Sequence, residues 1–552
     1  MLNGIIFKQA LISGANNIVN HRQEVDALNV FPVPDGDTGT NMSMTISAAA
    51  RELQVCEQTD IASVSAKAAA ALLRGARGNS GVILSLIFRG ISNGFKGMDS
   101  ADGRALAKAL ELGKESAYKA VMKPTEGTIL TVIRMAAEAV KNTQETDCKA
   151  VLKTAYEAAK DALLKTPEML PVLKQAGVVD AGGQGFIFIL EGMLSVIEDG
   201  KTVEPIETLD KKDNGKTDKS VVAAASGDIK FGYCSEFLIN REKNAQSNAA
   251  ALKAYLESIG DCVVVVEDDD IIKVHVHSNE PGNVIQAALK CGPLTNIKID
   301  NMRFQHRNAE RGTENAKEEI NPSEQAQTPV EPTKDYGFVS VAAGDGFVEL
   351  FKELGADNIV SGGQTMNPST DDILSAIEAT PARHVFVLPN NKNIIMAAEQ
   401  TVNLADRKVS VLQTKTLTQG VSAMLNFSET EDVETNLLNM MKAAEAVHTA
   451  QVTFAARDSE AFGQKIKKGQ ILGMEDGKIT LVEDDIVNAA YRTARRLAKK
   501  YNASFITVYY GEETDEVMAN LLSERLSERF PNIEINVIPG GQPVYYFIIS
   551  VE

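Results

Sequence analysis

Apolar residues recur at helical spacing through the first 200 residues of the 552-residue chain, whereas strict alternation of apolar and polar positions is scarce there. Segments 61–73, 105–121 and 131–140 are typical, and polar glycine-rich loops separate them. This pattern predicts an all-α helical first module over residues 1–200.

Short strand-like runs alternate with helical runs beyond residue 220. The strand-like runs lie at 231–239, 262–267 and 271–277, and the helical runs lie at 246–258 and 283–290. We therefore predict a small α+β middle domain over residues 221–305.

The last module alternates strands and helices more regularly. Strands such as 338–341 and 385–388 are each followed by a helical run, which favours a parallel sheet. Antiparallel strands are expected later, ending with 543–551. An α/β C-terminal domain over residues 336–552 follows from this pattern.

Two polar stretches separate the three modules. Residues 201–220 are almost entirely charged or polar, and residues 306–335 are similar with added proline. Neither can bury enough apolar surface to offset the entropy of ordering, so we predict two linkers, the second of them disordered. Several domains are also expected from length, because a domain averages about 150 residues.

The composition narrows the partners and the compartment. Lys and Arg number 56 against 74 Asp and Glu, so the net charge of −18 disfavours nucleic acid and anionic membranes. A metal ion or backbone amides can still admit a phosphate compound locally. Five cysteines without a CxxC spacing indicate a reduced interior. With no leader-like N-terminus and only short apolar runs, the sequence predicts a cytoplasmic protein without an integral membrane segment.

The densest chemical signal is the stretch NVFPVPDGDTGTNM at residues 29–42. Asp35 and Asp37, one glycine apart in a loop, can converge on Mg²⁺, which prefers carboxylate and phosphate oxygens. Three polar residues that follow can offer hydroxyl, amide and helix N-terminal N–H groups to an anion. They are Thr38, Thr40 and Asn41. A solvated turn explains the stretch about equally well, whereas a calcium loop would need a terminal glutamate.

Three further glycine loops precede apolar helices in the same module: GARGNSG at 75–81, PTEGT at 124–128 and DAGGQG at 180–185. Each alone is weak evidence, because glycine often only ends a helix or allows close packing. Together the four loops predict helix N-termini and loop amides gathered at one end of a bundle as a phosphate cradle. Neither GxxxxGK[ST] nor GxGxxG occurs, so a nucleotide site must be of another type.

These four motifs closely resemble the nucleotide-binding L domain of dihydroxyacetone kinases. Their combination with two further modules is similar to the ATP-binding A component of bacterial fatty acid kinase, and the resemblance covers essentially the whole chain. It implies an eight-helix antiparallel barrel whose loop end holds ATP through Mg²⁺ ions that bridge aspartates and phosphates.

The resemblance assigns roles residue by residue. Asp35 and Asp37 match metal-binding aspartates, and Asn29 stands nearest to a third aspartate of the glycerone-kinase branch, with one extra residue in the spacing. The matching nucleotide-binding residues are Thr38, Thr40, Asn41, Gly78, Asn79, Ser80 and Gly81 on the phosphate side and Thr125, Gly127, Thr128, Asp180, Gly182 and Gly183 in the enclosing loops. Arg77, within GARGNSG, is a catalytic candidate that could stabilise equatorial phosphate oxygens, and a surface ion pair is the equally weighted alternative.

A second constellation lies in the middle domain. His275 and His277 share one face of a predicted strand, and a thiolate from Cys234 on a neighbouring strand gives three of four Zn²⁺ ligands. An ordinary strand with half-exposed histidines is the alternative. The resemblance supports a metal in this domain and so favours zinc. Glu236, Glu280 or water are candidates for the fourth ligand.

The C-terminal module carries a helix-capping signature in Ser369 and Asp372. It is distantly similar to the fatty-acid carrier proteins that partner the kinase, which implies docking of such a carrier. The resemblance therefore implies transfer of the γ-phosphate of ATP to the carboxylate of a carrier-bound fatty acid, giving acyl phosphate. A component of a small-polyol kinase of the dihydroxyacetone type and a nucleotide-sensing scaffold are the alternatives, and a homodimer is compatible with the sequence.

Overall fold

A computed structural model of the chain describes residues 1–29, 36–121, 124–205, 231, 233–240, 249–267, 271–301, 330–363, 366–455, 459–461 and 464–552. The chain forms two compact units: Met1–Asp213 together with Gln325–Glu552, and Asn214–Glu324. The first and third modules of the sequence therefore share one unit, and the middle module lies in the other. Most of the two predicted linkers lies outside the described residues.

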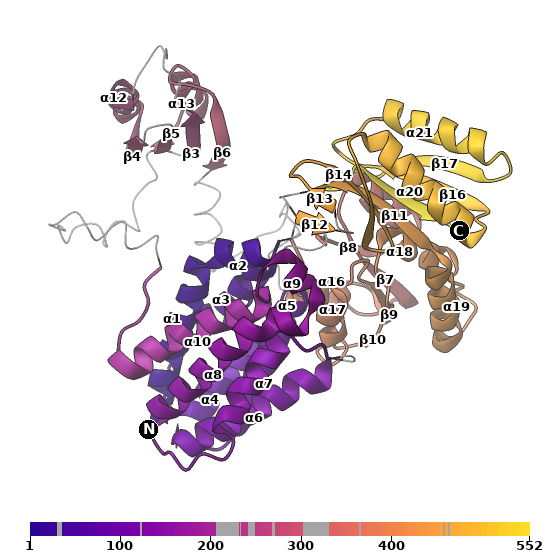
Figure 1. The fold of residues 1–552 in the computed structure, drawn as a ribbon. Helices are drawn as coiled ribbons and strands as arrows, with labels where there is room; N and C mark the ends of the chain where they lie inside the picture. Colours follow the sequence, from indigo (N-terminus) through magenta and orange to yellow (C-terminus); the bar gives the residue numbers. More distant parts are fainter. Residues whose placement is uncertain are drawn as a thin grey trace. The chain divides into compact units, whose positions relative to one another are not determined.

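The N-terminal part of the larger unit is a helical domain (Figure 1). Its helices are α1 (Gly4–Asn20), α2 (Arg22–Leu28), α3 (Thr38–Gln54), α4 (Ile61–Arg74), α5 (Gly78–Gly94), α6 (Gly103–Ala120), α7 (Ile129–Val140), α8 (Cys148–Met169), α9 (Pro171–Ala176) and α10 (Ala181–Asp199). The prediction of a helical N-terminal region is confirmed. A pair of two-residue strands, β1 (Leu2–Asn3) and β2 (Ser100–Ala101), is the one addition among the described residues.

The long helices start alternately at two ends of this domain. At one end, backbone hydrogen bonds join the start of α1 to the loop before α4, with Gly4 N–H donating to Thr59 O at 2.9 Å. The start of α6 is joined there to the loop before α8, with Gly103 N–H donating to Thr146 O at 2.8 Å. Helices α3, α5 and α10 start within the glycine motifs and α7 starts directly after one, and these four starts lie at the opposite end.

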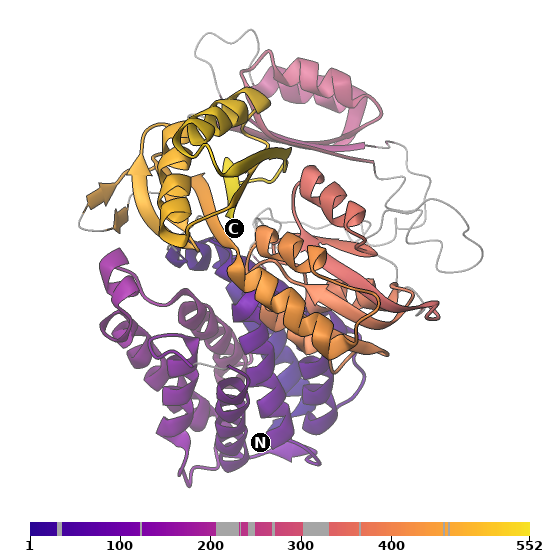
Figure 2. The same ribbon diagram turned by 90° about the vertical axis from the view of Figure 1, so that its right-hand side faces the viewer.

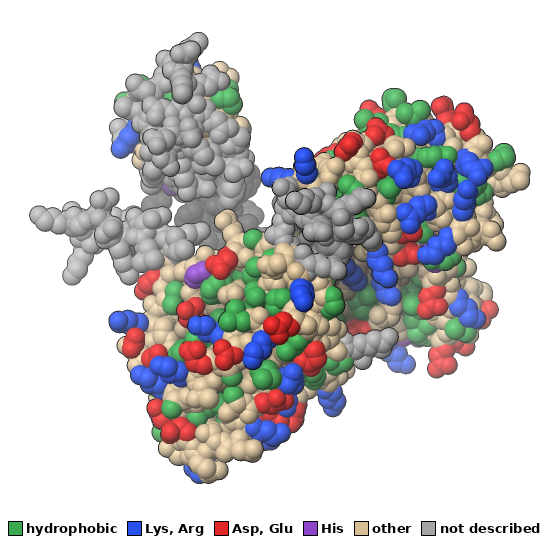
Figure 3. All heavy atoms as spheres, in the orientation of Figure 1, with side chains coloured by type: hydrophobic (Ala, Val, Ile, Leu, Met, Phe, Trp, Pro, Cys, Tyr) green, Lys and Arg blue, Asp and Glu red, His purple; other side chains and the backbone are tan. Residues whose placement is uncertain are grey.

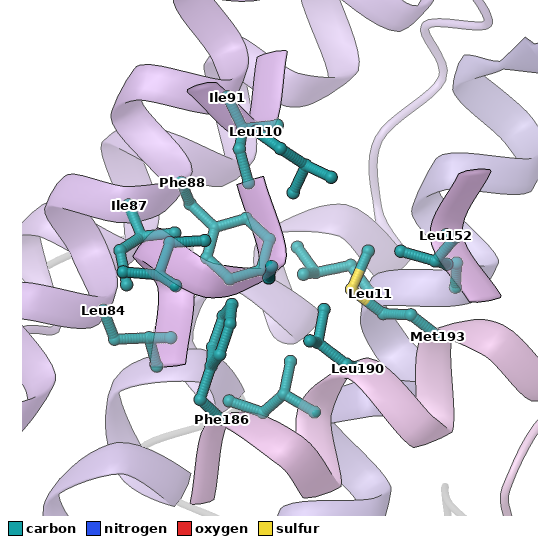
Figure 4. Close-up of a cluster of buried hydrophobic side chains, with 14 of the residues drawn as sticks. Leu11, Leu84, Ile87, Phe88, Ile91, Leu110, Leu152, Phe186, Leu190 and Met193 are labelled. Carbon is teal, nitrogen blue, oxygen red and sulfur yellow. The ribbon is translucent and has the colours of Figure 1, made fainter. Parts of the chain in front are cut away.

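A continuous apolar core holds the helices together. Figure 4 shows Phe88 of α5 and Phe186 and Leu190 of α10 pointing into one cluster with Leu11 of α1, and all four are buried. Helix α10 is long and apolar enough to cross a membrane, yet 72% of its apolar 18-residue stretch is buried inside this domain. A core helix accounts for that composition.

The smaller unit contains an antiparallel sheet in the order β4-β5-β3-β6. Its elements are β3 (Tyr233–Asn240), α12 (Ala249–Ile259), β4 (Gly260–Glu267), β5 (Ile271–Ser278), α13 (Pro281–Ala288) and β6 (Leu294–Asn301). Apolar strand residues such as Val274 and Val276 pack with Leu252 and Leu256 of α12 in one buried cluster. The pattern of the sequence did not predict β6.

The C-terminal part of the larger unit begins with a parallel sheet in the order β10-β9-β7-β8. Its elements are β7 (Lys334–Ala342), α15 (Asp345–Glu353), β8 (Asn358–Ser361), α16 (Thr370–Glu378), β9 (Ala382–Leu388), α17 (Ile395–Thr401), β10 (Lys408–Val411), α18 (Leu417–Leu425) and α19 (Val433–Ala446). Ser369 and Asp372, which carry the predicted capping signature, form a full capping box at α16. Each side chain accepts from the backbone N–H of the other residue.

A second, largely antiparallel sheet follows in the order β15-β14-β11-β18-β16-β17. Its strands are β11 (His448–Phe454), β14 (Ile471–Glu475), β15 (Lys478–Glu483), β16 (Phe505–Tyr510), β17 (Glu534–Pro539) and β18 (Phe547–Val551), with a separate pair β12 (Ser459–Ala461) and β13 (Gln464–Ile466). Helices α20 (Ile486–Tyr501) and α21 (Glu516–Arg529) cover one face of the sheet (Figure 2). The predicted mixture of parallel and antiparallel strands is present here.

Candidate active site

A cavity of about 330 Å³ lies at the end of the helical domain where the glycine loops stand. All four loops reach it. The predicted residues that line it are Asn29, Thr38, Asn79, Ser80, Thr125, Thr128, Asp180 and Gly182. Apolar residues supply most of the remaining wall: Leu28, Ile83, Val121, Ile129, Leu130, Val172, Leu173, Ala181 and Met396. An apolar cavity with a few convergent polar groups is the usual form of a small-molecule site.

Asp37 stands at the N-terminus of α3 but does not cap it. Its side chain makes no hydrogen bond to the backbone of its own helix. The carboxylate instead accepts from two side-chain amides, Asn29 Nδ2 at 3.4 Å on Oδ1 and Asn367 Nδ2 at 2.6 Å on Oδ2. Its predicted partner Asp35 lies outside the described residues.

Thr40 is engaged away from the cavity. Its hydroxyl donates to Asp26 Oδ2 at 2.8 Å, and its backbone N–H donates to Asp26 Oδ1 at 3.0 Å. Asp26 therefore accepts from the N–H and the hydroxyl of Thr40, which we had expected to contact an anion. Asp26 lies 14 residues before Thr40 in the sequence, and no local rule connects residues at that spacing.

Glycine is required at the start of α5. Gly78 has φ +56°, and a Cβ there would come within 2.7 Å of Asn41 Nδ2. The predicted Gly81 allows close packing instead, because a Cβ would lie 2.4 Å from Thr45 Oγ1. The two asparagines beside these glycines, Asn41 and Asn79, each have a buried Oδ1 without a hydrogen-bond partner among the described residues.

Arg77 does not line the cavity. Its guanidinium Nη1 donates to the backbone oxygen of Asn367 at 2.9 Å and lies 3.3 Å from Asp372 Oδ2. Its own N–H donates to Thr45 Oγ1 at 3.2 Å. The arginine is thus paired with a carboxylate from the C-terminal part of the chain.

Sequence reasoning missed Glu126, which anchors the PTEGT loop. Its carboxylate accepts from Thr131 Oγ1 at 2.6 Å, Arg134 Nη2 at 2.9 Å and Tyr118 Oη at 2.9 Å. Burial alone would raise the pKa of Glu126, but these hydrogen bonds outweigh burial and lower it. Thr131 also accepts from Gly127 N–H at 2.8 Å, so the loop is tied to the first turn of α7.

Asp180 caps α10 and also faces the cavity. Its Oδ2 accepts from Gly183 N–H at 2.7 Å. Burial raises the pKa of Asp180 to about 6, and the hydrogen bond from Gly183 offsets only part of that effect. The predicted Gly183 lies against α7 and α8, where a Cβ would come within 2.9 Å of Val132 and Leu163.

The residues present fit a magnesium-bound phosphate. The oxygen donors that Mg²⁺ prefers are at hand in the Asp37 carboxylate and in the unpartnered Oδ1 atoms of Asn41 and Asn79. Neither Asp37 at α3 nor Arg77 at α5 provides a side-chain cap for its helix. Figure 3 shows acidic and basic side chains interspersed over the visible face of the helical domain. Attraction for an anion must therefore arise locally, from helix N-termini and a metal.

In the smaller unit, strand register brings two of the predicted zinc ligands together. Cys234 on β3 is paired directly with His277 on β5, and His275 follows two residues away on β5. The side chains of Cys234 and His275 lie outside the described set, and His277 is half-buried. Among the described side chains, no group of three or more His, Cys, Asp or Glu is placed to hold a metal ion.

A helical domain with a glycine-loop cavity, a small α+β domain and a two-sheet C-terminal part define a multidomain protein. Three family models match the chain: DAK2 domain at residues 32–195, the FakA-like middle domain of fatty acid kinase at 230–309, and the FakA-like C-terminal domain of fatty acid kinase at 337–552. The chain belongs to the FakA-like family of fatty acid kinase proteins. These matches support a kinase.

Full-length relatives agree with this assignment. Protein YloV of Bacillus subtilis is 40% identical over 558 residues, covering 100% of this chain and 99% of the relative. An uncharacterized protein of Staphylococcus epidermidis is 37% identical over 555 residues, with the same coverage.

Solved structures show weaker likeness. A Streptococcus pneumoniae fatty acid kinase B3 protein loaded with linoleic acid has a TM-score of 0.28 at 13% identity, covering 40% of this chain and 99% of that chain. The dihydroxyacetone kinase of C. freundii in complex with AMP-PNP and Mg²⁺ has a TM-score of 0.28 at 20% identity, covering 35% and 34%.

Proposed function

We propose that the chain transfers the γ-phosphate of ATP to the carboxylate of a fatty acid presented by a separate carrier protein, giving an acyl phosphate. The observation that carries the proposal is the cavity that all four glycine loops reach, together with the buried Oδ1 of Asn79 in its wall, which has no hydrogen-bond partner among the described residues. Family membership supplies the substrate class.

The phosphate end of ATP is assigned to the starts of α3 and α5. Thr38, Asn79 and Ser80 line the cavity there, where helix N–H groups favour an anion. Asp37, with Asp35 and Asn29, would hold Mg²⁺, which when bound neutralises charge on the phosphates. Arg77 lies one residue before α5 and would add positive charge on the phosphate side.

The nucleoside end is assigned to the apolar wall of the cavity. Ile129 and Leu130 of α7 and Val172 and Leu173 of α9 supply apolar surface, and the network around Glu126 fixes the adjoining loop. This division places charge stabilisation at one end of the cavity and shape recognition at the other.

The acceptor needs no general base. A fatty carboxylate has lost its proton well below pH 7 and can attack the γ-phosphorus directly. The helical domain carries a single histidine, His21. Its Nδ1 lies 2.9 Å from Asn17 O, and its ring stacks on Phe188 at 4.1 Å. These contacts support a structural role for His21.

The middle domain is proposed to hold one Zn²⁺ through Cys234, His275 and His277, for structure or substrate positioning. The direct register of Cys234 with His277 supports this proposal. Elemental analysis of protein expressed with ample zinc should find about one equivalent, lost on Cys234→Ser or His277→Ala. Zinc-free wild-type protein would restore the interpretation of an ordinary strand.

We assign docking of the carrier to the C-terminal part. The protein is proposed to be cytoplasmic. The test of the whole proposal is mass spectrometry after incubation with ATP, Mg²⁺ and a lipid-loaded carrier. Acyl phosphate is expected with wild-type protein and none with Asp37→Asn. Phosphorylation of dihydroxyacetone instead would identify a polyol kinase, and nucleotide binding without any product would identify a scaffold.

A further inference from the structure

A segment of the C-terminal part lies against the two glycine loops of the phosphate side. Asn367 donates to Asp37, the backbone oxygen of Asn367 accepts from Arg77, and Asp372 pairs with Arg77. Backbone contacts accompany these bonds, because Thr370 N–H donates to the oxygen of Ala76 at 3.0 Å. Two of the residues proposed for phosphate chemistry are therefore held by residues about 300 positions away in the chain.

A shared apolar cluster supports these polar contacts. Val82 and Leu86 of α5 are buried together with Ile373 of α16, Ile394 and Ala397. The segment around α17 also reaches the cavity, since Met396 forms part of its wall. The contact is thus a packed interface with an apolar core, and its polar bonds are partly buried at the edge of that core.

We propose that Asn367 and Asp372 are positioning residues of the kinase site, through which the C-terminal part completes that site in cis. Asn367 fixes the carboxylate of Asp37, and Asp372 fixes the guanidinium of Arg77. This inference rests on the roles proposed above for Asp37 and Arg77, and it goes beyond them by making the helical domain incomplete alone.

The geometry explains why Asp37 needs outside support. Asp60, Asp102, Asp147 and Asp180 begin other helices of the domain, and each accepts from a backbone N–H of its own helix. Asp37 provides no side-chain cap, and its two carboxylate oxygens instead accept from the side-chain amides of Asn29 and Asn367. Donors on both oxygens restrain the orientation of the carboxylate.

Asp372 acts similarly on Arg77. A guanidinium carries five N–H donors, and contacts with Asn367 and Asp372 at Nη1 orient the fork while leaving donors for a phosphate. Asp372 is itself immobilised by the capping box at α16, with Ser369 N–H donating to it at 2.7 Å. A helix start of the C-terminal part thereby fixes the direction of Arg77.

Asn367→Ala in the full chain tests the first contact. We expect binding of AMP-PNP to weaken at least about tenfold with Mg²⁺ present and to change less than about twofold without it. Hydrogen exchange should increase in peptides covering 36–45 and 75–82. Asn436→Ala is the matched control, because Asn436 is equally buried in the C-terminal part but bonds only to Ser428 and Glu431 in the described contacts.

A double-mutant cycle separates positioning from general destabilisation. If Asn367 acts through Asp37, then Asn367→Ala should have little further effect on Mg²⁺-dependent binding in an Asp37→Asn background. Additive losses would overturn the inference, because they would mean that Asn367 acts independently of Asp37. This readout requires no acceptor and no carrier.

Asp372→Asn tests the second contact, since asparagine can still cap α16 but carries no charge for Arg77. We expect kcat to fall at least about fivefold with an unchanged melting temperature. Asp432→Asn is the control, because the carboxylate of Asp432 also accepts a backbone N–H at a helix start, from Thr435 of α19, although it does so as the N-cap residue. If wild-type protein fails to bind Mg-AMP-PNP, the proposed function is wrong. If it binds and all Asn367 and Asp372 variants match wild type, the positioning inference alone is wrong.

Discussion

The two ends of the helical domain use the same sequence chemistry for different purposes. At the end that carries β1 and β2, helices α1, α4, α6 and α8 begin at Asn3, Asp60, Asp102 and Asp147, and each side chain caps its own helix. At the cavity end, α3 and α5 begin at Asp37 and Arg77 without any side-chain cap. An aspartate before a helix is therefore ambiguous until its bonding partners are known.

The difference teaches where helix N-termini are open to a ligand. A capped helix start uses a backbone donor for the side chain of its own cap residue, whereas a start without such a cap keeps more of its N–H groups for an anion. At α3 the N–H of Thr40 is nonetheless taken by Asp26, so α5 is the more open of the two starts. Helices α7 and α10 also begin at the cavity end, but Thr128 and Asp180 cap them. The comparison supports the proposal that α5, with the start of α3, forms the phosphate side and that α7 and α10 enclose the nucleotide.

The largest effect is expected from an Asp→Asn substitution at each end of the helical domain, which replaces one carboxylate oxygen with an amide nitrogen. Asp37→Asn should lower phosphoryl transfer by roughly a thousandfold, about 4 kcal/mol, because the amide cannot neutralise a metal ion as a carboxylate does. Asp35→Asn should behave in the same way. Asp102→Asn is the control at the opposite end, and steady-state kinetics should show wild-type turnover for it. Near-normal turnover of Asp37→Asn would sink the assignment of the phosphate side.

The sequence could predict that the glycine motifs stand at helix starts, because the signals for helix starts are local. Helix starts, glycine and short polar side chains are recognisable within a few residues, and eight of the predicted site residues do line one cavity. The bond from Asn367 to Asp37 spans 330 positions, so no local pattern could predict it. Thr40 shows the same limit at shorter range, since its hydroxyl is taken by Asp26.

The sequence did not predict strand β6, because that segment lacks a clear alternation of apolar and polar residues. Strand β6 reads LTNIKIDN, in which polar residues interrupt the alternation, and it is defined by pairing with β3. Pairing with residues far away in the chain sets this strand, just as the cluster that unites α5 with α16 is formed by residues far apart in the chain.

A pH titration distinguishes Asp180 from the caps at the opposite end. Because burial raises its pKa from 3.8 to about 6, the folded state binds this proton more tightly than the unfolded state. The stabilising effect of protonation is complete below about pH 3.8 and is lost as pH rises through 6. Relative to Asp180→Asn, the wild type should therefore lose about 2 to 3 kcal/mol of stability between pH 4 and pH 8.

Nucleotide-free unfolding curves of the two proteins across this pH range provide the measurement. Asp102→Asn is the control: hydrogen bonds from Ala105 and Arg104 lower the pKa of Asp102, so its difference from wild type should stay flat across this range. If the stability difference between wild type and Asp180→Asn also stays flat with pH, the Asp180 carboxyl is solvated and its pKa is not raised by burial.

Arg77→Ala should lower kcat at least about tenfold, equivalent to roughly 1.4 kcal/mol of transition-state stabilisation. Arg77 directly precedes the start of α5, and under the proposed function its positive charge would stabilise charge that develops on the phosphate. His21→Ala should retain activity, because its ring is committed to Phe188 and Asn17. The reverse ranking in steady-state assays would reject both the base-free reaction and the role of Arg77.

The smallest effect is expected at a cap that has no chemical role. Asp147 accepts from Lys149 N–H at 3.2 Å at the start of α8, and it lies at the end of the domain away from the cavity. Asp147→Ala should cost about 1 kcal/mol and lower the melting temperature by about 2 to 4 °C, as loss of an N-cap does in a domain of this size. Affinity for Mg-AMP-PNP and kcat should both stay within about twofold of wild type, because the helix starts at the cavity end keep their N–H groups. A tenfold change in either would show that the two ends are coupled through the helices, and the distinction between capping and phosphate-binding aspartates would then fail.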